Sequence, residues 1–367
     1  MHANLMAKLD RGARLDAQDG LTLLAGNFPI GELMAYAHQA RMQKHPDPAV
    51  SFVYDTNPNY TNVCVTHCEF CAFWRSDRAK DAYTLAPAEL AARVKTAADA
   101  GATTVLLQGG HNPDVTLGHW LAYVAAIREA CPAIHVHPFS PPEIAYLSDQ
   151  SGLSTRLIVE QLHAAGVRTM PGGGAEILVQ RVRDAIAPEK CSAARWLDIM
   201  REAHEVGMKT TATMMYGHVE TPAEIVEHLL AVRELQDCTH GFSSFIAWSF
   251  KPGNSTLGKK VRLAAHPMRY LRLIATARLV LDNVPHVQSS WFSEDLRTGQ
   301  LGLLAGADDF GGLLFEESVL GKAGHAPKTS LLRTLDVIRA MGFEPTQRNS
   351  FYEVIERYGM GEAQRAG

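Results

Sequence analysis

From Val50 onward, short apolar or β-branched runs alternate with longer amphipathic stretches, and this rhythm continues through most of the remaining chain. Strands that alternate with helices favour a parallel sheet, because each helix returns the chain to the start of the next strand. The runs predict eight strands, at residues 50–54, 103–107, 134–137, 167–170, 210–214, 244–248, 286–291 and 307–310.

The stretches between these runs have the apolar spacing and the boundary residues of helices. They predict six helices, at residues 87–100, 116–130, 155–165, 194–206, 222–235 and 267–281. About eight strand–helix units without an obvious linker indicate an α/β fold, a closed (β/α)8 barrel of the TIM type, with a partial barrel as the alternative. In either case the functional site is expected among the loops that follow the C-terminal ends of the strands.

The two ends of the chain differ from this repeating pattern. Residues 1–49 are helical in character and predict an N-terminal helical cap. Residues 50–330 form the predicted barrel, and residues 331–367 are expected to be a C-terminal helical extension packed on it. No fixed-period repeat or charge block is present, so we expect one catalytic domain with helical additions.

Composition narrows the class of partner. Lysine and arginine number 35 against 39 acidic residues, and the net charge of -4 gives no electrostatic reason to expect nucleic acid. No apolar run approaches the roughly 18 to 20 residues that a bilayer span needs, and residues 1–25 lack the order of a signal peptide. We expect a cytoplasmic protein that acts on a small molecule, without a membrane partner.

Three of the six cysteines lie within eight residues, directly after the first predicted strand: Cys64, Cys68 and Cys71. Thiolates bind iron–sulfur clusters strongly, and three of them leave one iron of a four-iron cluster without a protein ligand. A zinc site is the alternative, but it needs a fourth ligand and no second short-spaced Cys or His pair lies nearby. The remaining cysteines, Cys131, Cys191 and Cys238, share no short spacing and are interpreted as small apolar residues.

This C-x3-C-x2-C spacing, with Phe70 before the last cysteine, resembles the signature of the radical S-adenosylmethionine superfamily. The resemblance implies a 4Fe-4S cluster, S-adenosylmethionine chelated to its open iron, and reductive cleavage to a 5′-deoxyadenosyl radical. It also implies that the backbone at Gly109 and Gly110 meets the methionine amino group. An ordinary turn after the second strand is the alternative for those glycines.

A closer resemblance covers most of the chain and is to the branch of the superfamily that makes menaquinone and deazaflavin precursors. It is most marked for the members of the futalosine route to menaquinone. The motifs that carry it are at residues 57–64, 71–75, 171–176, 209–221, 248–252 and 306–312.

This closer resemblance implies a reaction and its requirements. Hydrogen is removed from C4′ of the substrate's ribose, the carbon radical attacks an attached benzoate ring, and loss of an electron and a proton restores aromaticity. The site then needs a near-attack pocket, a polar or cationic partner for the benzoate and a base. An external electron donor such as flavodoxin or ferredoxin is implied as well.

Three further residues are candidates for cofactor binding. Glu176 follows three glycines at an expected strand-to-helix junction, where its carboxylate could bind the cofactor or could instead interact with the helix dipole. Arg181 lies five residues later, and a solvated arginine is its alternative. Ser140 begins a rigid Ser-Pro-Pro-Glu loop after the third strand and is expected to contact the ligand.

Asp309, Tyr216 and His218 are the candidates for proton transfer. Asp308 and Asp309 adjoin the last predicted strand, and neighbours in a strand point to opposite faces, so at most one of them faces the interior. Tyr216 and His218 follow the fifth strand, and histidine titrates near neutral pH. A hydrogen-bonded structural role is the alternative for each.

Other reactions of the same branch would share the cysteine loop. These are addition of the adenosyl radical to an enolpyruvyl benzoate, as in aminofutalosine synthase, and formation of a deazaflavin. An iron–sulfur redox protein without catalytic turnover is the alternative from another class, and a barrel-sized chain with glycine-rich loops argues against it.

Overall fold

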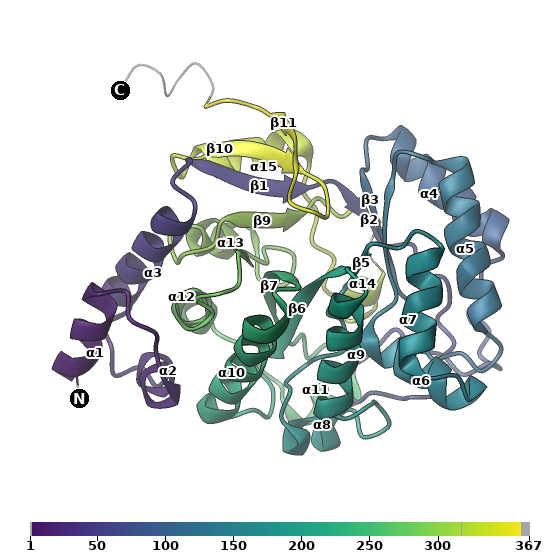
Figure 1. Ribbon diagram of the computed structural model, residues 1–367, viewed down its shortest axis with the longest axis horizontal. Helices are drawn as coiled ribbons and strands as arrows, with labels where there is room; N and C mark the ends of the chain where they lie inside the picture. Colours follow the sequence, from purple (N-terminus) through teal and green to yellow (C-terminus); the bar gives the residue numbers. More distant parts are fainter. Residues whose placement is uncertain (1, 317, 361–367) are drawn as a thin grey trace.

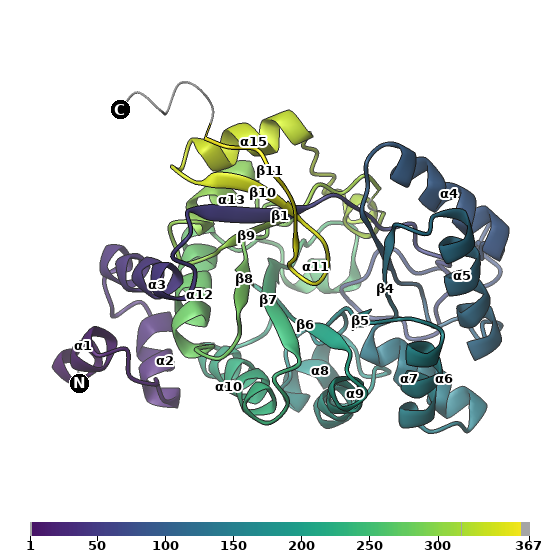
Figure 2. The ribbon, with the colours of Figure 1, turned by 45° about the horizontal axis from the view of Figure 1, so that its top comes forward.

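The computed structural model describes residues 2–316 and 318–360, and it contains all eight predicted barrel strands. Figures 1 and 2 together show these strands, with helices packed around most of them. The strands are β1 (Ala49–Val53), β3 (Thr104–Leu107), β4 (His135–Pro138), β5 (Thr169–Met170), β6 (Lys209–Tyr216), β7 (Phe242–Ser249), β8 (His286–Gln288) and β9 (Asp309–Gly312).

The six predicted helices are also present: α4 (Pro87–Asp99), α5 (Leu117–Ala130), α7 (Thr155–Ala164), α9 (Ala193–Glu205), α10 (Pro222–Thr239) and α12 (Pro267–Val280). Local chemistry sets their starts. Thr221, for example, caps α10, with Pro222 at the first helical position and Glu224 reaching back to the cap. Five further helices were not predicted: α6 (Pro141–Ser151), α8 (Gln180–Ile186), α11 (Thr256–Lys260), α13 (Leu296–Gly302) and α14 (Val319–Lys322).

Backbone pairing closes the barrel everywhere except at one seam. β1 pairs with β9, and from there parallel pairing runs through β8, β7 and β6 to β5. In the other direction β2 (Asp55–Thr56), which continues β1, pairs with β3, and β3 pairs with β4. The seam lies between β4 and β5, which are not paired through their backbones in the described part of the chain. There, His135 Nε2 and His137 Nδ1 lie 2.7 and 2.6 Å from Thr169 Oγ1. The fold is therefore a TIM-type barrel joined at one place by side chains.

The strand register gives the stagger expected of such a barrel. Through β3, β4 and β5 the contacts lead from Asp55 to Lys209 of β6. Through β9, β8 and β7 they lead from Ser51 to Thr213 of β6. The strands are therefore staggered around the barrel, as their tilt requires.

The N-terminal cap consists of α1 (His2–Asp10), α2 (Ala17–Leu24) and α3 (Ile30–Lys44). Figures 1 and 2 show these helices on one side of the barrel, with α3 beside α12. No helix in the described part of the chain is long and apolar enough to cross a membrane.

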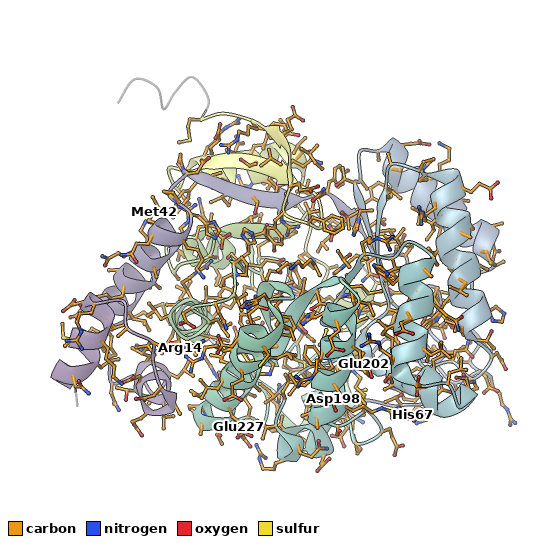
Figure 3. The ribbon with its side chains drawn as sticks, in the orientation of Figure 1. Arg14, Met42, His67, Asp198, Glu202 and Glu227 are labelled. Atoms are coloured by element: carbon orange, nitrogen blue, oxygen red, sulfur yellow. The ribbon has the colours of Figure 1, made fainter. Side chains whose placement is uncertain are left out.

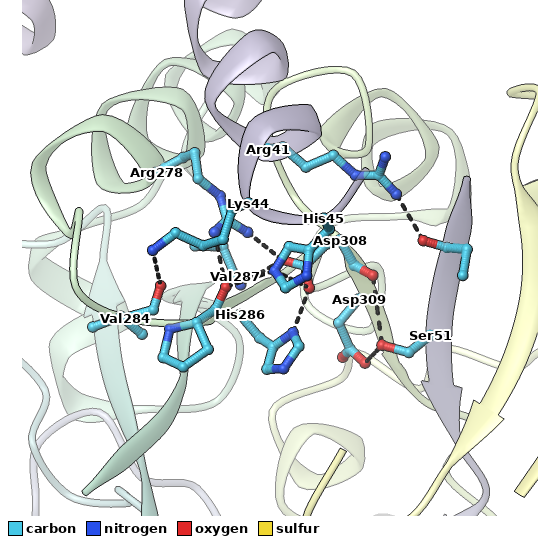
Figure 4. A network of polar contacts seen from close by, with 12 residues as sticks. Arg41, Lys44, His45, Ser51, Arg278, Val284, His286, Val287, Asp308 and Asp309 are labelled. Atoms are coloured by element: carbon cyan, nitrogen blue, oxygen red, sulfur yellow. Dashed lines mark hydrogen bonds and ion pairs between the residues drawn. The ribbon is translucent and has the colours of Figure 1, made fainter. Parts of the chain in front are cut away.

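A charged network joins the cap to the barrel, as Figure 4 shows. Asp308 accepts hydrogen bonds from Arg278 and from His286 Nδ1, the latter at 2.5 Å, while His45 at the end of α3 stacks on His286. One ligand atom from each of His45, His286 and Asp308 lies within 4.8 Å of the others. Because Arg278 already neutralises the buried carboxylate, we interpret this group as an ion-pair network.

The C-terminal extension is not wholly helical, and this part of the prediction is wrong. After α15 (Leu331–Arg339) the chain forms β10 (Glu344–Arg348) and β11 (Val354–Arg357). β10 pairs in parallel with β1 and β11 turns back antiparallel to it. The sequence of β10, Glu-Pro-Thr-Gln-Arg, has no apolar alternation, because its polar side chains are buried against partners from other strands.

The loop between β10 and β11 lies across the starts of three barrel strands. Ser350 Oγ is 3.2 Å from Thr104 Oγ1 of β3, and the Phe351 ring contacts His135 of β4. The Tyr352 ring stacks on His286 of β8 at a centroid distance of 3.8 Å. The C-terminal segment therefore covers the end of the barrel at which the strands begin.

Arg348→Met should destabilise the fold strongly. It removes the guanidinium that holds the fully buried Asp309 carboxylate, and an unpaired buried charge costs about 3–5 kcal/mol. Arg357→Met, which breaks exposed ion pairs with Asp47 and Glu344, should cost only about 0–1 kcal/mol. Urea unfolding followed by circular dichroism measures both, and equal losses would contradict the assignment.

Candidate active site

A cavity of about 410 Å³ lies among the loops at the C-terminal ends of the barrel strands, within the size range of small-molecule sites. The lining has three parts. Cysteines lie at one end, which we call the cysteine end; polar side chains such as Arg348 lie at the floor; and apolar side chains such as Trp248 and Phe292 form the walls. The lining includes Cys64, Cys68, Phe70, Cys71, Gln108, Gly109, Gly110, Ser140, Glu143, Glu176, Lys190, Trp248, Gln288, Phe292, Leu314, Arg348 and Tyr352.

The cysteine loop is held by backbone hydrogen bonds to itself and to neighbouring helices. Cys64 N donates to Arg75 O at 3.0 Å, and Cys71 N donates to Cys68 O at 3.1 Å. Glu69 N donates to Ile186 O at the end of α8. Figure 3 shows His67 of this loop far across the molecule from Arg14 and Met42 of the N-terminal cap.

Of the three cysteines, Cys68 is buried, and Cys64 and Cys71 are partly buried. Burial raises the pKa of Cys68 to about 12, although the nearby Lys190 ammonium opposes the shift. Burial also raises the pKa of Cys71. Metal binding must therefore displace thiol protons.

The donor set fits an iron–sulfur cluster better than a single ion. A tetrahedral zinc ion with bonds of about 2.3 Å would draw the sulfurs to about 3.8 Å from one another. Among the described residues, the group gathered within 4.8 Å is His45, His286 and Asp308, and the three cysteine sulfurs are spread more widely. Three separated thiolates suit a cubane that keeps one iron open.

A buried ion pair faces the cysteines. Lys190 Nζ lies 2.7 Å from Glu176 Oε1 and 5.2 Å from the centre of the Phe70 ring. Burial opposes the charge on Lys190, but the neighbouring Cys68 and Glu176 outweigh it and raise the Lys190 pKa. Glu176 has a φ of 45°, a strained value for a residue other than glycine, and such residues gather at ligand sites.

Gly109 and Gly110 are required by close packing against the cysteine loop. A Cβ atom at Gly109 would lie 2.5 Å from the Tyr60 ring, and one at Gly110 would collide with Val63 O and lie 2.8 Å from Cys64 Cβ. Gly109 N and Gly110 N donate within the protein, whereas the Gly109 carbonyl has no hydrogen-bond donor among the described residues. That carbonyl is the group available to a ligand ammonium.

Glu143 connects the loops at this end of the cavity. It is almost fully buried and accepts hydrogen bonds from Tyr60 Oη at 2.8 Å, Gly109 N at 3.1 Å and both Ser140 N and Ser140 Oγ. Ser140, predicted to contact the ligand, lines the cavity, but its hydroxyl donates to Glu143. Burial raises the pKa of Glu143, and these donors oppose the shift.

Four sequence-based candidates lie outside the cavity lining and need correction. The side chain of Arg181 is exposed and pairs with Glu224, because its face of α8 turns toward α10. Asp309 is deep in the barrel, at the level of Ser51, where Arg348 binds it through two nitrogen atoms.

Tyr216 and His218 are structural in this fold. The Tyr216 hydroxyl donates to Glu294 Oε1 at 3.1 Å, and its ring packs on Tyr270. His218 is buried, with Nε2 2.9 Å from Met215 O. Neither side chain reaches the cavity, because each turns into the packing between β6 and the helices around it.

Sequence reasoning missed several residues that line the site. Glu143 was detectable, because Ser-Pro-Pro-Glu is a capping box whose glutamate faces the preceding loop. Asp55 was detectable as the polar residue at the C-terminal end of the first strand. Lys190, Arg348 and Tyr352 carried no local signal, since they come from segments without strand or helix periodicity.

Comparison with known proteins is consistent with this geometry. The model of the radical SAM superfamily matches residues 58–232, and the model of the CofH/MqnC C-terminal region matches residues 239–359. The crystal structure of HydG, a maturase of the [FeFe]-hydrogenase, aligns over 95% of this chain and 77% of its own with a TM-score of 0.75. Its sequence identity is 14%, so it supports the fold alone.

Two groups of full-length relatives are similar to this chain. Cyclic dehypoxanthine futalosine synthase of Halalkalibacterium halodurans is 37% identical over 98% of this chain and 96% of its own length. The 5-amino-6-(D-ribitylamino)uracil--L-tyrosine 4-hydroxyphenyl transferase of Methanopyrus kandleri is 38% identical over 95% and 94%.

Gly110→Ala should reduce iron binding while the barrel remains folded. The added methyl group meets backbone that cannot move aside, at a cost of about 1–3 kcal/mol that falls on the cysteine loop. Iron and sulfide per chain after anaerobic reconstitution measure the effect. Gly31→Ala, where the methyl group enters open space, is the control, and equal cluster content in the two variants would contradict the packing argument.

Proposed function

The chain belongs to the radical SAM superfamily, and we propose that it cyclises dehypoxanthine futalosine to cyclic dehypoxanthine futalosine in the futalosine pathway of menaquinone biosynthesis. The observation that carries this function is the full-length similarity to cyclic dehypoxanthine futalosine synthase. The cavity supports it, because one end has three thiols and the rest has apolar walls with a few polar groups.

At the end of the cavity near the cysteines, one set of residues is suited to bind the cluster and another to bind S-adenosylmethionine. Cys64, Cys68 and Cys71 hold the 4Fe-4S cluster and leave one iron open. With S-adenosylmethionine bound there, the cluster supplies a 5′-deoxyadenosyl radical. The Gly109 carbonyl and the Glu176 carboxylate are suited to receive the cofactor's ammonium and hydroxyl groups.

The opposite end of the cavity suits a substrate with an aromatic carboxylate. Among the described lining residues, Lys190 and Arg348 are the long cationic side chains, and Lys190 belongs to the cysteine end. Arg348 retains guanidinium hydrogens beyond those given to Asp309 and Asn349, so it is our candidate for the benzoate. Trp248 and Phe292 in the walls exclude water and orient the rings for reaction.

The reaction also needs an electron from outside the chain. We propose a small external donor such as flavodoxin or ferredoxin, since the proposed cluster must be reduced before the first cleavage and again whenever its electron is lost. A cytoplasmic location agrees with this, because the three cysteines must stay reduced to bind iron and the cytosol maintains thiols in that state.

The similarity to the M. kandleri transferase makes a deazaflavin-type reaction the second candidate, and aminofutalosine synthesis is the third. All three use the same cysteine end of the cavity. A redox protein without turnover is disfavoured by a substrate-sized cavity beside the thiols.

Reduced, cluster-loaded protein with S-adenosylmethionine and dehypoxanthine futalosine should yield 5′-deoxyadenosine and a product lighter by two hydrogens. Liquid chromatography with mass spectrometry detects both. The comparison arm offers 5-amino-6-(D-ribitylamino)uracil with tyrosine. Product from that arm alone, or only uncoupled cleavage with the first substrate, would refute the substrate assignment.

Cys68→Ala should abolish 5′-deoxyadenosine formation, because it removes a buried cluster ligand. Cys238→Ala, at an exposed site remote from the cavity lining, should retain it. Cleavage by Cys68→Ala at the rate of Cys238→Ala would show that the cluster is bound elsewhere.

A further inference from the structure

The last step of the proposed reaction requires a base, and the sequence-based candidates do not reach the cavity. After ring closure, the attacked aromatic carbon still carries its hydrogen. Restoring aromaticity breaks that C–H bond and removes one proton and one electron. The proton acceptor must have an oxygen or nitrogen atom that faces the substrate and is free to bind hydrogen.

Most titratable side chains in the cavity lining are already committed. Glu143 accepts four hydrogen bonds, and Glu176 is paired with Lys190. Burial lowers the pKa of both His111 and His137 to about 3, so each is a weak base.

Asp55 differs from these residues in its position. It continues the inward-facing series Ser51, Val53, Asp55 at the C-terminal end of the first strand, which is the catalytic end of a barrel of this type. The register places Ser51 beside Asp309 and Val53 beside Gly312. Asp55 therefore lies nearer the C-terminal end of the barrel than the Asp309–Arg348 pair, and it lines the cavity.

Only one oxygen of the Asp55 carboxylate accepts a hydrogen bond from another residue in the described part of the chain. Leu314 N donates to Oδ1 at 3.0 Å, whereas Oδ2 accepts no side-chain or backbone hydrogen bond from another described residue. Gly312 makes room for this carboxylate, because a Cβ at that position would collide with its oxygens. The glycine at the end of the 306–312 motif thus leaves the space that the Asp55 carboxylate occupies.

The electrostatic setting suits a base near neutral pH. Burial raises the pKa of Asp55 to about 6, with Arg348 from β10 opposing the shift and Asp309 from β9 adding to it. β3 presents the uncharged Thr104 beside it. Burial also raises the pKa of Tyr352, which stays neutral in this range.

We propose that Asp55 is the catalytic base that takes the proton from the benzoate ring after cyclisation. The role rests on the proposed function. The C–H bond breaks and the proton passes to Asp55 Oδ2, while the oxidised iron–sulfur cluster held by the three cysteines would take the electron, so that charge and electrons balance. Asp55 then releases the proton to water as product leaves.

Asp55→Asn tests this role with substrate that carries deuterium at C4′. We expect deuterated 5′-deoxyadenosine to form in the first turnover as in the wild type, because hydrogen abstraction precedes the step that Asp55 serves. Cyclised product per 5′-deoxyadenosine should fall about 100-fold or more, the usual contribution of a general base. The wild-type rate should fall below about pH 6, where Asp55 is protonated, and the residual rate of the variant should lack this dependence.

Stability gives a readout that is independent of turnover. Because the folded-state pKa of Asp55 is raised from 3.8 to about 6, its ionised form destabilises the fold above that pH. Protonation stabilises the wild type as the pH falls through 6, and the metal-free Asp55→Asn variant should lack this part of the gain in urea unfolding. At pH 8 the variant should be no less stable than the wild type.

Two further variants complete the test. Gly312→Ala displaces the carboxylate without changing its chemistry and should lower the product ratio too, so it decides the matter if Asp55→Asn does not fold. Asp99→Asn, at an exposed pair with Lys95, should behave as the wild type.

The outcomes separate this role from the proposed function. Normal product formation by Asp55→Asn, or an equal fall in deuterium transfer and product, would overturn the role of Asp55 as the base. Absence of cyclised product from the wild type would overturn the proposed function and, with it, this role.

Discussion

The cofactor end of the cavity depends on one buried carboxylate. Glu143 accepts hydrogen bonds from Tyr60, Gly109 and Ser140, which belong to the loops after three successive strands of the barrel. A carboxylate removed from water is tolerated only when donors surround it, so these loops must converge on it. This arrangement packs Gly110 against Cys64 and thereby fixes the position of the cysteine loop.

At the floor of the cavity, ion pairing decides which acids remain available. Arg348 binds Asp309 inside the barrel, and Arg278 binds Asp308 beside the N-terminal cap, so both neighbours in the Asp-Asp motif are neutralised. Asp55 lies one level higher and is left with a free carboxylate oxygen. Because Arg348 arrives on β10, the C-terminal segment contributes to the cavity as well as to the stability of the barrel.

Errors in the sequence-based site show what residue spacing does not contain. Arg181 is close to Glu176 in sequence, but its side chain extends to Glu224 on another helix. His218 follows a strand, as a catalytic residue often does, and yet turns inward to the Met215 carbonyl. In each case the direction of the side chain after a loop depends on packing against a distant segment.

The sequence by itself determined the eight barrel strands, six of the helices between them and the cysteine loop. These follow from periodicity, capping chemistry and ligand spacing, which act over a few residues. Only the tertiary structure decided the β4–β5 seam, the strands β10 and β11 in the C-terminal extension, and the partners of the buried acids Asp55 and Asp309. The physical reason is that the protonation of a buried acid depends on the charged groups around it. The charged group here is Arg348, which lies far along the chain from Asp55 but beside it in the barrel.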